Sequence, residues 1–207
     1  GRKEPFPAAS VSLYDVQGTI LPRNDYAPNG TDCIARVPGT TVIKTAVQYP
    51  SNFYFPGGGD WVQSNPYPGT SWNNPIWHPS PTGKSLFDPC PPGWKLPVDG
   101  TWDTFALPGM STPNAANYPG DYRNGQDQAG WEFYMSGSSG ETVFYPASGY
   151  RLITTGAMRY ERGSGYFWSS TPYSSTSGRF LYFNATDMSP QNTANRSHGF
   201  PARCIQE

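Results

Sequence analysis

The stretch DPCPPGWKLP, residues 88–97, is the feature around which the rest of the chain can be placed. Its four prolines fix φ and lack a backbone N–H, so the stretch cannot be a central strand or the interior of a helix. Gly93 permits a tight bend, and Trp94 can bury a large aromatic surface directly after it. We therefore expect a rigid elbow that carries one thiol, Cys90, and one aromatic anchor.

A short helix is predicted directly after the elbow. Pro97 disfavours helical geometry in the residue before it, and Asp99 is a suitable N-cap for a helix that begins there. Trp102 and Phe105 lie three residues apart, so a helix places both side chains on one face. We expect this face to pack against the body of the domain.

The composition indicates a folded domain that is rich in loops. A chain of 207 residues is long enough to bury a core. Its 23 Gly and 23 Pro approach a low-complexity composition, but 7 Trp, 14 Tyr and 11 Phe exclude disorder, because disordered chains are poor in aromatic residues. Only 14% of residues are charged, so Ser, Thr, Asn and Tyr must form much of the surface. We predict the α+β class, with small twisted antiparallel sheets, one or two short helices and long ordered loops.

The charge argues against nucleic-acid binding, and the hydropathy argues against a transmembrane segment. A formal net charge of -1 gives no basic patch that could neutralise phosphates, so nucleic-acid binding is not expected. No apolar run in the sequence approaches the ~20 residues that a transmembrane helix requires, so no such segment is predicted.

The chain divides into an N-terminal part, residues 1–45, and a main domain, residues 46–207. The first part either forms strands packed on the main domain or is a linker, and its residues support both interpretations. In the main domain a polar loop is expected over residues 107–130. Alternating patterns and turn residues predict two hairpins, 131–135 with 142–146 and 166–170 with 179–183, a turn between 150–152 and 158–160, and a closing strand, 199–205.

The order of several motifs resembles a family of surface proteins of gut Bacteroidetes. These motifs are the elbow at 88–97, GYFWSS at 165–170, FLYF at 180–183 and RSHGFPARC at 196–204. The family includes fimbrillin-like proteins and paralogous lipoprotein domains. Its layout is similar to the C-type lectin-like fold, which sulfatase-modifying enzymes and the variable proteins of diversity-generating retroelements also use. The resemblance covers about residues 46–207 and implies a C-type lectin-like fold.

The three cysteines predict one disulfide and one leftover cysteine if the protein is exported. We pair Cys90 with Cys204, because the elbow and the closing strand should meet near the closure of the chain. Such a bridge is worth up to ~4.7 kcal/mol in the chain-entropy model. Cys33 is then free or pairs with a domain outside this chain. Three reduced thiols in a cytosolic protein are the alternative.

Residues 164–198 have the composition of a recognition surface. Tyr and Trp provide large rigid contacts at a low entropic cost, while Ser, Gly and Asn supply adaptable hydrogen bonds. Neighbouring residues of a strand face opposite sides, so Phe167 and Trp168 cannot both face a ligand, and the resemblance implies that Trp168 packs inward. The predicted ligand-binding residues are Tyr166, Tyr173, Arg179, Tyr182, Asn184, Asn192, Asn195, Arg196 and His198.

Catalytic and metal sites receive less support from the residues. A nucleophile with a base needs a histidine, and only His78 and His198 are present. The 15 acidic residues are scattered, no G-x-S-x-G motif occurs, and no Cys-x-x-Cys pair indicates zinc. We predict no cofactor and no metal. Calcium held by oxygen atoms of Asp121, Asn124 and Asp127 is the alternative.

These observations predict a non-enzymatic ligand-binding or adhesion module at the cell surface, with a glycan or a surface protein as its ligand. The resemblance implies the terminal or tip domain of a pilus-like or lipoprotein assembly. An upstream domain or pilus subunits would then be partners, and a region before residue 1 would anchor the protein in the outer membrane. The alternatives are an enzyme on the same scaffold, either a cysteine-dependent oxidase or a carbohydrate-active enzyme, and a purely structural pilus subunit.

Overall fold

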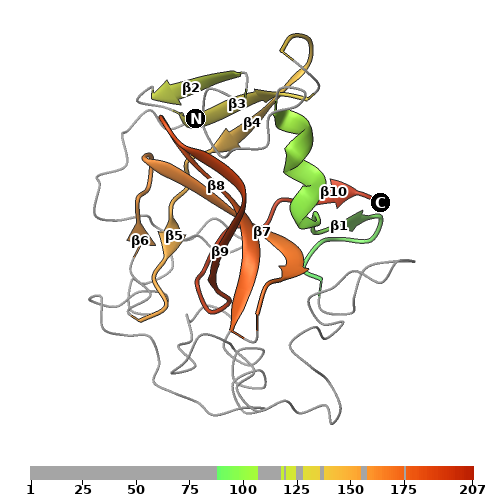
Figure 1. Cartoon of the computed structure of the whole chain (residues 1–207), viewed down its shortest axis with the longest axis vertical. Coiled ribbons are helices and arrows are strands. Elements are labelled where there is room, and N and C mark those ends of the chain that lie inside the picture. Colours follow the sequence, from blue (N-terminus) through green and yellow to red (C-terminus); the bar gives the residue numbers. More distant parts are fainter. Residues whose placement is uncertain are drawn as a thin grey trace, which may run out of the picture.

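The computed structural model describes residues 88–106, 118, 120–124, 128–135, 138–154, 158–174 and 176–207. The predictions for residues 1–87, including the N-terminal strands or linker and the partner of Cys33, lie outside these residues. The described part consists of small antiparallel sheets with one short helix (Figure 1). It agrees with the predicted α+β class in broad terms, although the helix is a minor part of the structure.

Ten short strands form four antiparallel sheets within the described residues. The elements are β1 (Trp94–Lys95), the 3-10 helix η1 (Asp99–Phe105), β2 (Gly120–Asn124), β3 (Ala129–Tyr134), β4 (Thr142–Pro146), β5 (Tyr150–Arg151), β6 (Met158–Arg159), β7 (Ser164–Pro172), β8 (Ser177–Asn184), β9 (Met188–Asn195) and β10 (Ile205–Gln206). β1 pairs with β10 and β5 with β6, while the two larger sheets have the orders β2-β3-β4 and β7-β8-β9.

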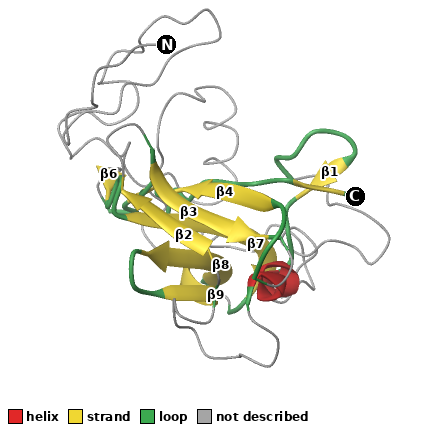
Figure 2. Cartoon of the chain, turned by 90° about the horizontal axis from the view of Figure 1, so that it is seen from above, coloured by secondary structure: helices red, strands yellow, loops and turns green. Residues whose placement is uncertain are grey.

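The core lies between the two larger sheets, which are stacked on one another (Figure 1, Figure 2). Phe133 of β3 and Phe183 of β8 are fully buried, and their rings meet edge to face with centroids 5.7 Å apart. The other buried residues of this core are Trp102, Phe105, Tyr118, Ala129, Trp131, Tyr145, Ala147, Phe167, Leu181 and Met188. Each large apolar side chain contributes ~1.5–3 kcal/mol on burial. Aromatic packing between two small sheets is therefore the main source of stability.

The predicted hairpin of 166–170 with 179–183 is confirmed as β7 and β8. Tyr166 lies opposite Tyr182, and Gly165 lies opposite Phe183. A Cβ atom on Gly165 would lie 2.1 Å from the Phe183 ring, so only glycine leaves room for that ring. Because side chains alternate along a strand, Gly165 and Phe183 face the core, whereas Tyr166 and Tyr182 face the other side of the sheet. The hairpin of 131–135 with 142–146 is also confirmed. The segments 150–152 and 158–160, which were predicted only to flank a turn, pair as β5 and β6.

The predicted helix is present as η1, and Trp102 and Phe105 are both buried as expected. Trp102 Nε1 donates a hydrogen bond of 3.2 Å to the Tyr145 hydroxyl of β4. The prediction that Asp99 caps the helix is wrong, because Val98 occupies the N-cap position and no side chain caps the helix. The Asp99 carboxylate instead accepts a hydrogen bond of 3.2 Å from the Thr171 hydroxyl, which ties η1 to β7.

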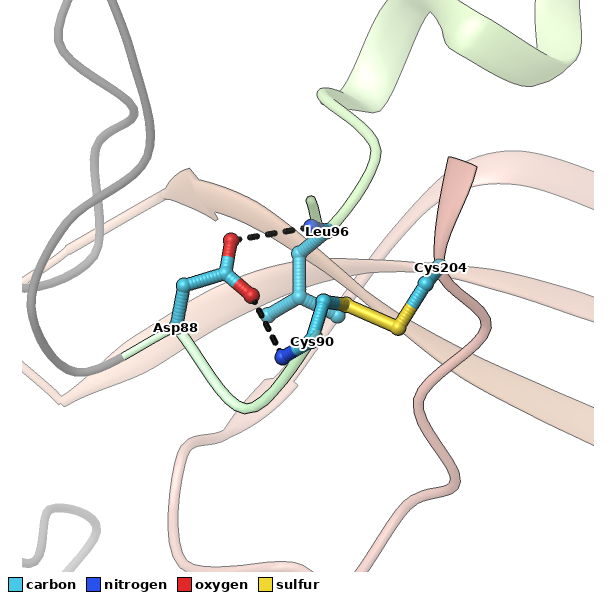
Figure 3. The surroundings of a disulfide bond; sticks show 4 residues. All are labelled: Asp88, Cys90, Leu96 and Cys204. Atoms are coloured by element: carbon cyan, nitrogen blue, oxygen red, sulfur yellow. Dashed lines mark hydrogen bonds between the residues drawn. A yellow bond between two sulfur atoms is a disulfide. The ribbon is translucent and has the colours of Figure 1, made fainter. Parts of the chain in front are cut away.

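The elbow and the end of the chain lie side by side. Cys90 and Cys204 form a disulfide, which confirms the predicted pairing (Figure 3). Asp88 closes the elbow, because its Oδ1 accepts a hydrogen bond from the Cys90 N–H (2.8 Å) and its Oδ2 accepts one from the Leu96 N–H (2.9 Å). The prediction that Trp94 is an aromatic anchor is wrong, since its side chain is 44% exposed beside β10.

Three strand predictions need correction. β2 lies inside residues 107–130, where we expected a continuous loop. β9 is an unpredicted edge strand, and its Pro190 lies where the register with β8 shifts, which is a position that tolerates proline. The closing strand over 199–205 is limited to β10, with an isolated bridge from Gly199 to Arg151.

Candidate functional site

Four tyrosines form a continuous row of ring contacts on the side of the β7–β9 sheet that faces away from the core. We call Tyr150, Tyr160, Tyr166 and Tyr182 the tyrosine row. The ring centroids are 6.1 Å apart between Tyr160 and Tyr150, 4.7 Å between Tyr150 and Tyr166, and 5.4 Å between Tyr166 and Tyr182. Tyr160 is 62% exposed and the other three are half-buried, so the row is held by packing but open to solvent.

Burial and the neighbouring phenols shift the pKa values of two tyrosines of the row. Burial raises the pKa of Tyr166 well above its usual range, and the hydroxyls of Tyr182, Tyr150 and Tyr160 raise it further, while a hydrogen bond with Ser164 opposes the shift. Burial also raises the pKa of Tyr150. Both phenols are therefore neutral at physiological pH, and each can take part in hydrogen bonds without carrying a charge.

A second aromatic cluster flanks the tyrosine row on the same side of the sheet. Phe200 stacks on Trp168 at a centroid distance of 4.5 Å, and it contacts Phe180 at 4.7 Å and Tyr166 at 5.1 Å. Trp168 Nε1 donates a hydrogen bond of 3.3 Å to the His198 carbonyl. The prediction that Trp168 packs inward is wrong, because Phe167 faces the core and Trp168 lies on the outer side of β7, where this cluster covers it. This second aromatic cluster covers the outer side of β7 and β8 and fixes the position of Tyr166.

His198 belongs to this second aromatic cluster. Its ring stacks on Phe200 at 5.3 Å and meets Tyr150 edge to face at 5.1 Å. Burial lowers the pKa of His198, although a hydrogen bond with the backbone of Arg151 opposes this shift. His198 is therefore neutral at pH 7 and provides a flat ring at the site rather than a charge.

Asn184 positions the Tyr182 hydroxyl at one end of the row. Its Oδ1 accepts hydrogen bonds of 2.7 Å from the backbone N–H groups of Thr186 and Asp187, which closes the turn between β8 and β9. Its Nδ2 donates a hydrogen bond of 2.8 Å to the Tyr182 hydroxyl oxygen. With that oxygen acting as an acceptor, the Tyr182 O–H can donate to a bound molecule.

A second group of predicted residues lies at the end of the β7–β8 hairpin, beside η1. The Arg179 guanidinium lies over the Tyr173 ring at 4.6 Å, and its Nη1 donates a hydrogen bond of 2.8 Å to the Gln191 carbonyl. Arg179 Nε is also 3.8 Å from Asp99 Oδ2. Arg179 thus joins β8, β9 and η1, while Tyr173 is 49% exposed.

Arg196 lies in the interior next to this second group. It is only 4% exposed, and its guanidinium donates hydrogen bonds to the carbonyls of Ser177 (3.2 Å) and Ser174 (2.5 Å). These bonds hold the loop between β7 and β8. We therefore assign Arg196 to the frame of the loop rather than to contact with a ligand.

The nine predicted ligand-binding residues thus fall into two places. On the outer side of the sheet, with the tyrosine row, lie Tyr166, Tyr182, Asn184, Asn192 and His198. At the end of the β7–β8 hairpin lie Tyr173, Arg179, Asn195 and Arg196. The first place has the larger exposed aromatic surface, and we take it as the candidate site.

Sequence reasoning missed Tyr150 and Tyr160. Both flank the predicted turn over 154–156, but nothing in the local pattern indicated that this arm packs against β7. Tyr160 adopts a left-handed conformation, with φ of 56°, which is uncommon for a residue other than glycine. Such a conformation costs ~1–3 kcal/mol and concentrates at functional sites. Here it accompanies the stacking of Tyr160 on Tyr150.

The calcium alternative is not supported by the placement of its ligands. Asp121 and Asn124 lie in strand β2 rather than in a loop, and their odd spacing directs them to opposite sides of that strand, while Asp127 lies outside the described residues. Among the described residues, no group of three or more His, Cys, Asp or Glu side chains could hold a metal ion.

The described helix is also too short and too polar to cross a membrane.

Comparison of the chain with protein-family models, with curated proteins and with solved structures finds no match. The functional conclusion therefore rests on the geometry of the site.

Proposed function

We propose that this chain is a non-enzymatic binding module that recognises a glycan at the cell surface through the tyrosine row. The observation that carries the proposal is the unbroken row of ring contacts from Tyr160 to Tyr182. Aromatic rings offer an apolar face to the C–H groups of a sugar, and their hydroxyls can pair with sugar hydroxyls. The row combines both kinds of contact on one surface.

Preorganisation supports binding at this site. Tyr166 packs against Phe200 and Phe180, and the Tyr182 hydroxyl is held by Asn184, so these side chains have few conformations left to lose. Binding usually costs ~0.5–1.5 kcal/mol for each side chain that becomes immobilised. A surface that is already ordered avoids much of this cost, which suits the weak individual contacts of a glycan.

The frame is consistent with a C-type lectin-like module outside the cell, and we include that fold and location in the proposal. The β1–β10 pair and the disulfide between Cys90 and Cys204 bring the elbow to the end of the chain. Disulfides persist in oxidising compartments, which favours an exported protein. A role as the terminal domain of a pilus-like or lipoprotein assembly would place the tyrosine row where it can reach a ligand.

A glycan array tests this proposal with one variant at the site and one matched control. Tyr160→Asn removes the exposed ring, and asparagine tolerates the left-handed backbone better than other residues. Tyr173→Ala removes a similarly exposed tyrosine at the end of the β7–β8 hairpin, outside the candidate site. We expect Tyr160→Asn to weaken the wild-type signals by on the order of tenfold, because it removes the most exposed ring of the row. Tyr173→Ala should leave the signals unchanged. Wild-type protein that binds no glycan would refute the proposal, and so would signals that depend only on Tyr173.

A further inference from the structure

The arm formed by β5 and β6 carries a positive charge beside the tyrosine row. Tyr150 and Arg159 are direct partners in the antiparallel register, so their side chains lie on the same side of the arm. Gly149, with φ of 65°, lets the two strands approach, because a Cβ atom there would be 2.2 Å from the Arg159 carbonyl oxygen. The close contact at Gly149 brings the backbone of Arg159 against the start of β5.

The charge of Arg159 is exposed and has no acidic partner among the residues that the structure describes. Arg159 is exposed, and neither of the two ion pairs in the described part of the chain involves it. Its guanidinium is near enough to Tyr150 to lower the pKa of that hydroxyl, against the larger effect of burial. Residues 150–163 contain three arginines and one glutamate, whereas the whole chain has a net charge of -1. The row is therefore bordered by a locally basic segment.

We propose that the glycan bound at the tyrosine row is acidic, and that Arg159 contacts its anionic group. This inference rests on the proposed function. A sugar ring that lies flat on the tyrosines directs its ring substituents outward along the surface, where a carboxylate or sulfate can meet the guanidinium. Arginine pairs with such groups through two parallel hydrogen bonds, so it recognises geometry as well as charge. A polysaccharide of uronic acid residues or of sulfated sugars has this chemistry.

Two pairs of polysaccharides that differ only in the anionic group provide the test. Polygalacturonate is compared with its methyl ester for the carboxylate, and dextran sulfate with dextran for the sulfate. We expect wild-type protein to prefer the charged member of one pair by on the order of tenfold, since charge-assisted hydrogen bonds are among the strongest polar contacts. The pair that shows the preference identifies the anionic group.

Three variants test whether Arg159 causes the preference for the charged polysaccharide. Arg159→Gln should remove the preference, and Arg159→Lys should restore only part of it, because lysine keeps the charge but not the paired hydrogen bonds. Arg123→Gln in β2 is the matched control, since it removes the same charge from another exposed arginine. It should leave the preference intact. Each variant is checked by its thermal unfolding curve before binding is measured.

The outcomes separate this inference from the proposed function. Equal binding of charged and neutral polysaccharides, still weakened by Tyr160→Asn, would overturn the acidic ligand and retain the glycan-binding module. A preference that survives Arg159→Gln, or that Arg123→Gln removes equally, would overturn the role of Arg159. If wild-type protein binds none of the four polysaccharides and no glycan on the array, the proposed function itself is overturned.

Discussion

Replacement of Gly165 by alanine is predicted to destabilise the fold through a clash in the core. The added Cβ atom would lie 2.1, 2.3 and 2.7 Å from three atoms of the Phe183 ring, whereas ordinary contacts begin near 3.4 Å. The ring cannot move freely, because it is fully buried with Phe133 at 5.7 Å and Phe167 at 6.3 Å. Overpacking of this kind costs ~1–3 kcal/mol, and we expect a value in the upper half of that range.

Urea unfolding followed by tryptophan fluorescence measures this cost. With an m-value of ~1–3 kcal/mol/M for a small domain, the midpoint should fall by about 1 M. Gly100→Ala is the control, because its Cβ atom would meet only Asp103 Oδ2 at 3.7 Å, and it should change stability by less than ~0.5 kcal/mol. Phe183→Leu combined with Gly165→Ala should cost less than the sum of the two single changes. If Gly165→Ala unfolds at the same urea concentration as the wild-type protein, the packing of Phe183 over Gly165 is refuted.

Three further outcomes are expected. Asp88→Ala removes both acceptors of the elbow and should lower the free energy of unfolding by ~1–3 kcal/mol in the same urea assay; an unchanged midpoint would contradict this role. Replacement of Cys90 and Cys204 by serine opens a loop with a separation of 114 residues and should cost up to ~4–5 kcal/mol, and a loss below ~1 kcal/mol would show that the bridge is not needed. The pKa of His198 is lower in the folded protein than its ordinary value of about 6.5, so the unfolded state binds more protons. The free energy of unfolding should therefore fall as the pH drops below about 6.5. His198→Phe should flatten this fall, and equal slopes for the two proteins would argue against a buried neutral imidazole.

The elements that could be predicted from the sequence are those whose signals are local. β3 and β4 are aromatic segments on either side of a Gly-Ser turn, and β7 and β8 are longer aromatic segments on either side of a Ser-rich turn. The three-residue spacing of Trp102 and Phe105 correctly placed both side chains on one buried face of the helix, although the N-cap argument for its start was wrong. The disulfide followed from the expected closure of the chain, not from any local pattern.

The features that escaped prediction depend on tertiary contacts. β9 is a mostly polar edge strand, and it contains Pro190, which a strand accommodates here only because the register with β8 shifts at that point. Asp99 resembles an N-cap locally, but its hydrogen-bond partner Thr171 is 72 residues away. In the candidate site, the contact of Tyr150 with Tyr166 joins separate hairpins. Outside that site, at the end of the β7–β8 hairpin, Arg196 is buried by a loop that its own hydrogen bonds hold. Composition alone could not distinguish an exposed arginine from a buried one.

Chemical footprinting of the tyrosines tests most directly whether the tyrosine row is the binding surface. Exposed phenols are acetylated with N-acetylimidazole, with and without a saturating glycan identified on the array, and each tyrosine is quantified by mass spectrometry. Tyr160 and Tyr173 are 62% and 49% exposed, so both should react in the free protein. We expect the glycan to protect Tyr160 several-fold and to leave Tyr173 reactive. Protection of Tyr173 with undiminished labelling of Tyr160 would contradict this prediction.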